Sequence, residues 1–236
     1  MKEIVRKFFH TAGLDVRNYG ISNYGRTKKL LDYHQINLVL DVGANKGQYY
    51  NFLRTLGYSG KIISFEPLSE AHSYLEKVSK KDPLWEIAPR LAIGNEEGEI
   101  SINIAGNSES SSLLPMLERH KNSAPQSAYI GSEIVKITRL DSIISSYLEN
   151  DAKVFLKVDV QGYEQKVLEG AKDILPQVKG IQLEVSILPL YDGELLFRDM
   201  LSYMDHLGYS MTYINPTFFD VNTGQMLQAD VIFLKV

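Results

Sequence analysis

Short apolar runs alternate with longer amphipathic stretches through the middle of the chain. Most of the apolar runs are rich in β-branched or aromatic residues and short enough to be buried parallel strands; they lie at 37–41, 61–66, 85–88, 154–159 and 181–185. The stretches between them are candidate helices, at about 47–57, 69–80, 162–174 and 194–206. This alternation predicts a doubly wound α/β sheet.

Two strand-like runs near the end of the chain break the alternation. They span 209–214 and 230–235, and the segment between them holds the turn signals Asn215-Pro216 and Asn222-Thr223-Gly224 without an obvious helix. A parallel pair of strands needs a longer, usually helical, crossover. We therefore expect these last two strands to pair antiparallel.

Two further segments lie outside the alternation. Residues 98–140 are a predicted insertion between the third and fourth strands, with strands of their own at 99–105 and 133–138. We expect this insertion to cover the active edge of the sheet. Residues 1–35 are a predicted basic helical extension of a domain that spans 36–236. We expect the extension to fold back on the domain; binding to a partner subunit, as in a homo-oligomer, or to an acidic surface is the alternative.

Composition removes several functional classes. With 44% hydrophobic and 23% charged residues, the 236-residue chain is ordinary globular protein. The absence of cysteine excludes disulfides, thiolate metal sites and a cysteine nucleophile. The net charge of −4 gives no overall basic field, so we expect no nucleic-acid partner. Neither a signal peptide nor an apolar run of transmembrane length is found, which predicts a cytoplasmic protein without a membrane span.

The strongest motif follows the first predicted strand. That strand ends in Asp41, and Gly-Ala-Asn-Lys-Gly over 43–47 leads into a helix. The two glycines allow a tight turn and close approach of a ligand to the backbone. The dinucleotide fingerprint is absent, because Asn45 and Gln48 stand where it needs other residues. The turn favours a ligand without phosphate whose amino-acid end meets Asp41; an ordinary strand-to-helix turn is the alternative.

The second predicted strand ends in Phe65-Glu66-Pro67. A carboxylate at this place can accept both ribose hydroxyls of an adenosine ligand. The alternative for Glu66 alone is a solvated residue near the start of a helix. Asp41, the two glycines and Glu66 together are hard to explain by packing, so the sequence predicts a nucleoside site at this edge of the sheet.

These residues belong to a longer series of short segments, which are Asp-Val-Gly-Ala-Asn-Lys-Gly at 41–47, Phe-Glu-Pro at 65–67, Ala-Ile-Gly at 92–94, serines at 110–112, Arg-Leu-Asp at 139–141, Leu-Lys-Val-Asp-Val-Gln-Gly-Tyr-Glu at 156–164 and Leu-Tyr-Asp-Gly at 190–193. The series resembles the FkbM family of class I S-adenosylmethionine-dependent methyltransferases over residues 36–236. The segment at 156–164 is the most specific. The resemblance implies a Rossmann-like, seven-stranded, mostly parallel sheet whose last strand is antiparallel.

The resemblance also implies O-methyl transfer to a hydroxyl of a small molecule or glycan, with S-adenosyl-L-methionine as the cofactor. Taken with the motifs above, it predicts that the cofactor is bound by Asp41, Gly43, Ala44, Asn45, Gly47, Gln48, Glu66, Pro67, Ala92, Ile93, Ser111 and Asp159. For Ser111 the sequence leaves two interpretations open, a lid over the ligand and a flexible polar loop.

Candidate catalytic residues come from the fourth and fifth strands. Alternation predicts that Lys157, Asp159 and Glu184 share one face near the carboxyl edge, and a buried Lys must pair with a carboxylate. Methyl transfer from a sulfonium is an in-line displacement that needs alignment, and a base helps a poorly nucleophilic hydroxyl. We expect Asp159 to be that base, with Glu184 second. No metal site is predicted, because the carboxylate spacing is not diagnostic. A purely structural ion-pair network is the alternative.

Other functions stay open at this point. An N-methyltransferase needs a less basic site, because an uncharged amine is already nucleophilic. A catalytically inactive protein that binds the cofactor as a scaffold is a second alternative, which an assay for methyl transfer separates from an enzyme. A nucleotide-sugar-binding enzyme is a third, which binds the sugar nucleotide and not S-adenosylhomocysteine.

Overall fold

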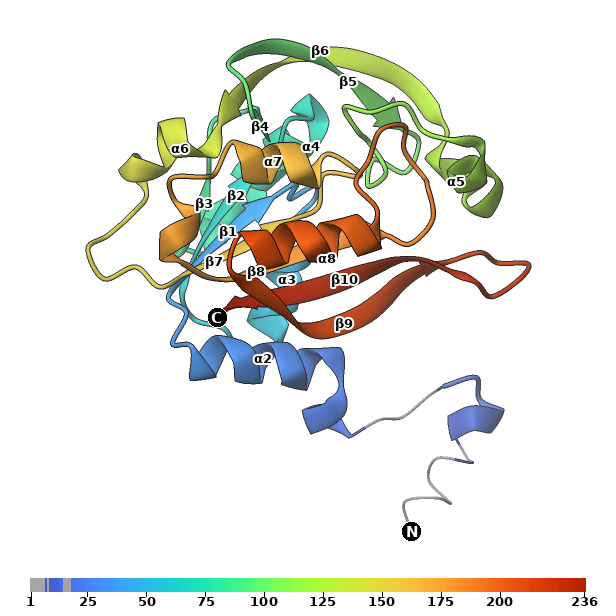
Figure 1. Cartoon of the computed structure of the whole chain (residues 1–236), viewed down its shortest axis with the longest axis horizontal. Helices are drawn as coiled ribbons and strands as arrows, with labels where there is room; N and C mark the ends of the chain where they lie inside the picture. Colours follow the sequence, from blue (N-terminus) through green and yellow to red (C-terminus); the bar gives the residue numbers. More distant parts are fainter. Residues whose placement is uncertain (1–6, 8, 15–17) are drawn as a thin grey trace.

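Seven strands form the central sheet of the computed structural model, which describes residues 7, 9–14 and 18–236 (Figure 1). In order across the sheet they are β3 (Trp85–Ile87), β2 (Lys61–Phe65), β1 (Leu38–Val42), β7 (Val154–Val158), β8 (Val178–Ser186), β10 (Met226–Lys235) and β9 (Tyr209–Phe219). Each of the predicted apolar runs overlaps one of these strands. The central strands β1 and β7 are buried at every position, as expected for parallel strands covered on both faces.

Strand directions follow the prediction. β3, β2, β1, β7 and β8 are parallel, whereas β10 runs antiparallel to both of its neighbours, β8 and β9. The predicted antiparallel pairing of the last two strands is therefore confirmed. The chain builds outward from β1 in one direction through β2 and β3 and later in the other through β7. The carboxyl ends of β1 and β7 therefore flank a topological switch point, where open α/β sheets bind ligands.

Helices cover both faces of the sheet. One face packs against α6 (Leu140–Ile143), α7 (Glu164–Glu169) and α8 (Phe197–His206), and the other against α2 (Asn23–Tyr33), α3 (Gln48–Thr55) and α4 (Ser69–Val78). Short 3-10 turns lie at Tyr19–Ile21, Ser79–Lys81, Pro125–Ser127, Ile144–Ser146 and Leu175–Gln177. None of the described helices is long and apolar enough to cross a membrane.

Helix α7 is much shorter than the predicted 162–174. It ends at Gly170, where a Cβ atom would lie 1.8 Å from the carbonyl oxygen of Gly94. Close packing of the chain against the neighbouring strand therefore requires glycine at this position, and glycine weakens a helix. A local contact in the tertiary structure sets the end of this helix, and the apolar periodicity does not report it.

The insertion contributes β5 (Gly98–Ala105), α5 (Glu118–Ser123) and β6 (Tyr129–Arg139). With β4 (Ala92–Gly94), which precedes the insertion, its two strands form a second sheet in the order β4, β6 and β5. The sequence did not predict β4 as a strand, and β6 is longer than the predicted 133–138. Ile102 and Ile137 of this sheet pack against Leu68 and Tyr163. Figure 1 shows the β5–β6 ribbon arching over α4 and α7, beside the edge at which β1 and β7 end.

The described part of the predicted extension includes α2, which lies against the sheet next to α3 (Figure 1). Leu31 of α2 is only 2% exposed and belongs to the same cluster as Val39 and Leu53. The expected folding back is therefore observed for this helix. Residues 1–6, 8 and 15–17 of the extension lie outside the described residues, and the domain boundary at 36 stays a prediction.

Candidate functional site

Two adjacent cavities open at the carboxyl ends of β1, β2 and β7. The first, here called the Glu66 cavity, is lined by Glu66, Pro67, Ala92 and Ile93 among others. The second, here called the Glu184 cavity, is lined by Glu184, Gln48, Lys157 and Gln161 among others and has a volume of about 380 Å³. Four residues line both cavities: Gly43, Asn45, Glu109 and Asp159. The predicted cofactor and catalytic residues thus come together around one wall.

The glycines of the turn serve contacts within the protein. Gly43 has a φ of +80°, and a Cβ atom there would lie 1.9 Å from the carbonyl oxygen of Asp159. Gly47 has a φ of +85°, and its Cβ would lie 2.9 Å from the ring of Trp85. The positive φ angles fit the predicted tight turn. Gly43 also lets the turn touch the loop after β7, and Gly47 lets it touch the indole of β3. Gly43 lines both cavities, and the predicted close approach of a ligand to this turn stays a prediction.

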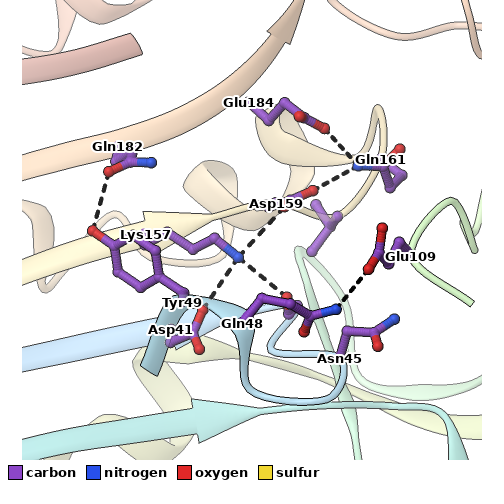
Figure 2. Close-up of polar contacts among 12 residues, drawn as sticks. Asp41, Asn45, Gln48, Tyr49, Glu109, Lys157, Asp159, Gln161, Gln182 and Glu184 are labelled. Carbon is purple, nitrogen blue, oxygen red and sulfur yellow. Dashed lines mark hydrogen bonds and ion pairs between the residues drawn. The ribbon is translucent and has the colours of Figure 1, made fainter. Parts of the chain in front are cut away.

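A buried ammonium group joins this turn to β7 (Figure 2). Lys157 Nζ lies 3.2 Å from Asp41 Oδ1 and 3.5 Å from Asp159 Oδ2, and it donates a hydrogen bond of 3.2 Å to the carbonyl oxygen of Gly43. The expected pairing of Lys157 with a carboxylate is confirmed. Burial by itself lowers the pKa of Lys157, but the charges of Asp41 and Asp159 outweigh it and raise this pKa above its usual value.

Asp41 is buried and is not among the residues that line the Glu66 cavity. Its side chain is 0% exposed, and its second oxygen accepts a hydrogen bond of 3.2 Å from Ser64 Oγ. Asp41 therefore lies beneath the turn and does not face the Glu66 cavity. Asp41 holds Lys157 in place. The expected contact of Asp41 with the amino-acid end of a ligand stays a prediction.

Glu66 stands at the floor of the Glu66 cavity and is 3% exposed. Its Oε2 accepts a hydrogen bond of 2.7 Å from the Asn45 N–H, and its Oε1 accepts one of 2.8 Å from the Leu68 N–H. Burial raises the pKa of Glu66 to about 7, against the lowering effect of the two N–H donors. Each carboxylate oxygen keeps a second lone pair, so Glu66 can accept further hydrogen bonds from a ligand.

The serine-rich loop, residues 107–112, lies over the turn at 43–47. Asn45 Nδ2 donates a hydrogen bond of 3.1 Å to Ser108 Oγ, and Gln48 Nε2 donates one of 2.8 Å to Glu109 Oε1 (Figure 2). Ser111 lines the Glu66 cavity, and its hydroxyl accepts the Ala105 N–H at 2.9 Å. Of the two interpretations left open by the sequence, this geometry favours an ordered lid.

Gln161 connects the two candidate catalytic carboxylates, and it was missed as a site residue although it stands inside the motif at 156–164. Its Nε2 donates to Asp159 Oδ1 at 2.7 Å and to Glu184 Oε2 at 2.6 Å (Figure 2). Its Oε1 accepts a hydrogen bond of 2.7 Å from the hydroxyl of Tyr191, which fixes the orientation of the amide. Tyr191 is buried behind Gln161 and positions it.

A third carboxylate lies beside Glu184. Asp230 of β10 is the antiparallel partner of Glu184 in the register of β8 and β10. Burial, followed by the charges of Asp159 and Asp230, raises the pKa of Glu184 well above its usual value. Burial and the charge of Asp159 likewise raise the pKa of Asp230 to about 6. The described residues contain no group of three or more His, Asp or Glu side chains arranged to hold a metal ion.

His120 of α5 also lines the Glu184 cavity. It is 3% exposed, and its Nδ1 has no hydrogen-bond partner among the described residues. Burial lowers its pKa to about 4, so the ring is neutral at physiological pH. Only the fold of the insertion brings this imidazole to the cavity.

The sheet order with its antiparallel β10, and two cavities at the switch point, are features of a class I methyltransferase, an α/β enzyme class. The sequence match agrees: residues 41–211 match the methyltransferase FkbM domain. The chain therefore belongs to the FkbM methyltransferase family, as its motifs predicted, and it is a methyltransferase.

The chain is also similar to individual known proteins. The chain is 28% identical over 177 residues to the 2-O-methyltransferase NoeI of Sinorhizobium fredii, covering 71% of this chain and 70% of that protein. Among solved structures, magnesium protoporphyrin IX methyltransferase from Synechocystis matches with a TM-score of 0.47 and 9% identity, over 100% of this chain and 97% of that one. An RNA methyltransferase from Pyrococcus horikoshii, described as putative, matches with a TM-score of 0.47 and 12% identity, over 90% and 83%.

The contact at Gly43 generates a first prediction. Replacing Gly43 by Ala places a Cβ against the Asp159 carbonyl oxygen, so the turn must move and the free energy of unfolding should fall by more than about 2 kcal/mol. Gly208→Ala is the matched control, because Gly208 has a φ of +81° with nothing within 4 Å of its Cβ position. That variant should lose only about 1 kcal/mol. Urea unfolding measures both, and equal losses would contradict the contact.

The raised pKa of Asp230 generates a second prediction. The folded protein keeps a proton on Asp230 up to about pH 6, whereas an unfolded Asp loses it near 3.8. This carboxyl therefore stabilises the fold less as pH rises through that window. Asp230→Asn should gain stability relative to the parent protein, by about 2 kcal/mol, between pH 4.5 and pH 7.

Thermal unfolding over this pH range measures the effect of Asp230→Asn. Asp205→Asn, an exposed carboxylate on α8, is the control and should follow the parent protein at every pH. A constant difference between Asp230→Asn and the parent protein would show that Asp230 titrates normally.

Proposed function

We propose that the protein transfers a methyl group from S-adenosyl-L-methionine to a hydroxyl of a small molecule or glycan. The observation that carries this proposal is the position of Asp159, which lines both the Glu66 cavity and the Glu184 cavity. A donor in the Glu66 cavity and an acceptor in the Glu184 cavity would meet beside its carboxylate. The relative NoeI is a 2-O-methyltransferase, which supports a hydroxyl acceptor.

The residues of the Glu66 cavity fit S-adenosylmethionine. The Glu66 carboxylate can accept the two ribose hydroxyls, and Ala92, Ile93 and Pro67 supply apolar walls for the adenine. The turn at 43–47 and the loop holding Ser111 border the part of the cavity nearest Asp159. When bound, the cofactor supplies a methyl group already activated by its sulfonium. What remains for the protein is to align the acceptor and to manage its proton.

Asp159 is the group that receives the proton of the acceptor hydroxyl in this proposal. Its Oδ2 contacts Lys157 at 3.5 Å and its Oδ1 accepts the Gln161 amide at 2.7 Å, so both oxygens are held in place. Lys157 compensates the charge of Asp159. Burial raises the pKa of Glu184 well above its usual value, which favours its protonated form. A neutral Glu184 can both donate and accept a hydrogen bond, which suits the orientation of a neighbouring acceptor hydroxyl.

The Glu184 cavity suits a polar acceptor of modest size. Its volume of about 380 Å³ is at the lower end of the range for small-molecule sites. Amides, hydroxyls and the neutral ring of His120 line it, together with the ring of Phe218. Such a lining offers several donors and acceptors for a molecule with many hydroxyls.

N-methyl transfer is the second candidate, because the three carboxyl groups of Asp159, Glu184 and Asp230 lie near one another and can attract an amine. Identification of the methylated atom in the product distinguishes the two reactions. Binding of the cofactor without methyl transfer would instead indicate a scaffold.

The base assignment predicts the behaviour of Asp159→Asn. Loss of the carboxylate should lower turnover by about 10²- to 10⁴-fold, the usual contribution of a positioned base. The dissociation constant for S-adenosylhomocysteine should change less than about threefold. Transfer of radiolabelled methyl groups and calorimetry measure the two quantities, with Asp205→Asn as the exposed control. Turnover close to that of the parent protein would remove Asp159 from the mechanism.

The pKa of Glu66 predicts how cofactor affinity depends on pH. Ribose hydroxyls bind best to the ionised carboxylate, which a pKa of about 7 depletes in acid. The affinity for S-adenosylhomocysteine should therefore fall about tenfold from pH 8 to pH 6. Calorimetry at a series of pH values measures this change. In Glu66→Gln the affinity should be weaker at pH 8 and nearly constant with pH; an unchanged pH dependence would contradict the role of Glu66.

A further inference from the structure

A third cavity of about 230 Å³ lies on the other side of Lys157. It is here called the Asp230 cavity, and Asn23, Phe52, Gln182 and Asp230 line it but not the Glu184 cavity. The two cavities share five residues, among them Lys157, Asp159 and Glu184. They therefore lie side by side around these residues, and the proposed reacting hydroxyl, beside Asp159, lies next to both.

Side chains around the Asp230 cavity are fixed by their own contacts. The Tyr49 hydroxyl donates to Gln182 Oε1 at 3.0 Å (Figure 2). Asp230 accepts hydrogen bonds from the side chains of Gln182 and Asn215. The half-buried ring of Phe52 stacks on Tyr49 with 5.7 Å between ring centroids, which holds an aromatic surface next to these polar groups. Little side-chain freedom is left to lose when a ligand binds.

This combination restricts the chemistry of a ligand. Planar amides and carboxylates beside an aromatic ring match a molecule that carries hydroxyls at its rim and C–H groups on its face. Lys157 is the only lysine or arginine among the described residues that line either cavity, and its charge is taken up by Asp41 and Asp159. Phosphate or sulfate groups would meet uncompensated carboxylates, so an anionic ligand is disfavoured.

We infer that the acceptor is a neutral oligosaccharide, and that the Asp230 cavity binds a second sugar ring while the ring to be methylated occupies the Glu184 cavity. This inference rests on the proposed function and specifies its substrate. It also assigns a role to the N-terminal extension, because Asn23 stands at the start of α2. The extension completes the acceptor site with a residue that lies far in sequence from the catalytic strands.

Kinetics on matched sugars tests this inference. The full-length protein is assayed with radiolabelled S-adenosylmethionine and a panel of neutral hexose disaccharides, each compared with the methyl glycosides of its two component sugars. The best disaccharide should exceed its better component by at least tenfold in kcat/KM. A phosphorylated form of that disaccharide should react more slowly than the neutral one.

Two variants locate the second ring. Asn23→Ala and Phe52→Leu should reduce the preference for the disaccharide to threefold or less, mainly by lowering kcat/KM for the disaccharide. Asn150→Ala, an exposed asparagine outside the residues that line the three cavities, is the control and should keep the full preference. Unchanged melting temperature and S-adenosylhomocysteine affinity check that the variants are folded.

Three negative results have different consequences for the second sugar site, the sugar acceptor and the proposed function. Equal kcat/KM for disaccharides and monosaccharides, or a preference that both variants retain, overturns the second sugar site and leaves O-methyl transfer standing. No methyl transfer to any sugar, despite binding of S-adenosylhomocysteine, overturns the sugar acceptor and the inference together. No binding of S-adenosylhomocysteine overturns the proposed function itself.

Discussion

The buried ion pair between Lys157 and Asp41 is the interaction on which the rest of the site depends. Asp41 and Lys157 are partners in the parallel register of β1 and β7, so the pair joins the two strands. The same ammonium group also contacts the Gly43 carbonyl oxygen and Asp159. Removing one partner of a buried pair leaves an uncompensated charge, at a cost of about 3–5 kcal/mol. The pair therefore fixes the turn and Asp159 together, and with them the wall that the Glu66 and Glu184 cavities share.

The site holds more carboxylates than the single lysine can neutralise. Gln161 donates to both Asp159 and Glu184, which lets two acids lie close together, while Asp230 adds a third from β10. The physical consequence is that the pKa values of Glu184 and Asp230 are raised above those of free carboxyl groups. Such an arrangement costs stability and persists at sites where proton transfer or recognition of hydroxyls requires it. A structural ion-pair network alone needs no surplus of acid.

The cavities proposed for the acceptor are built from parts outside the core of the sheet. The insertion contributes His120 and the serine-rich loop, β10 contributes Asp230, and α2 contributes Asn23. The Glu66 cavity, proposed for the cofactor, is lined in contrast largely by the turn at 43–47, Glu66 and β4, close to the strand ends. If these proposals hold, loops and added elements set the acceptor, while the strand ends hold the donor.

Apolar periodicity and the motifs determined the strand sequence, the antiparallel end of the sheet, the turn after β1 and the importance of Lys157, Asp159 and Glu66, because each is written in local spacing. The tertiary structure decided which side chains from different elements come into contact. The pairing of β10 with β8 brings Asp230 to Glu184. The close contact of Gly43 with the Asp159 carbonyl and the burial of Asp41 against Lys157 are likewise set by the tertiary structure. Such pairings join residues far apart in the chain, and no local pattern encodes them.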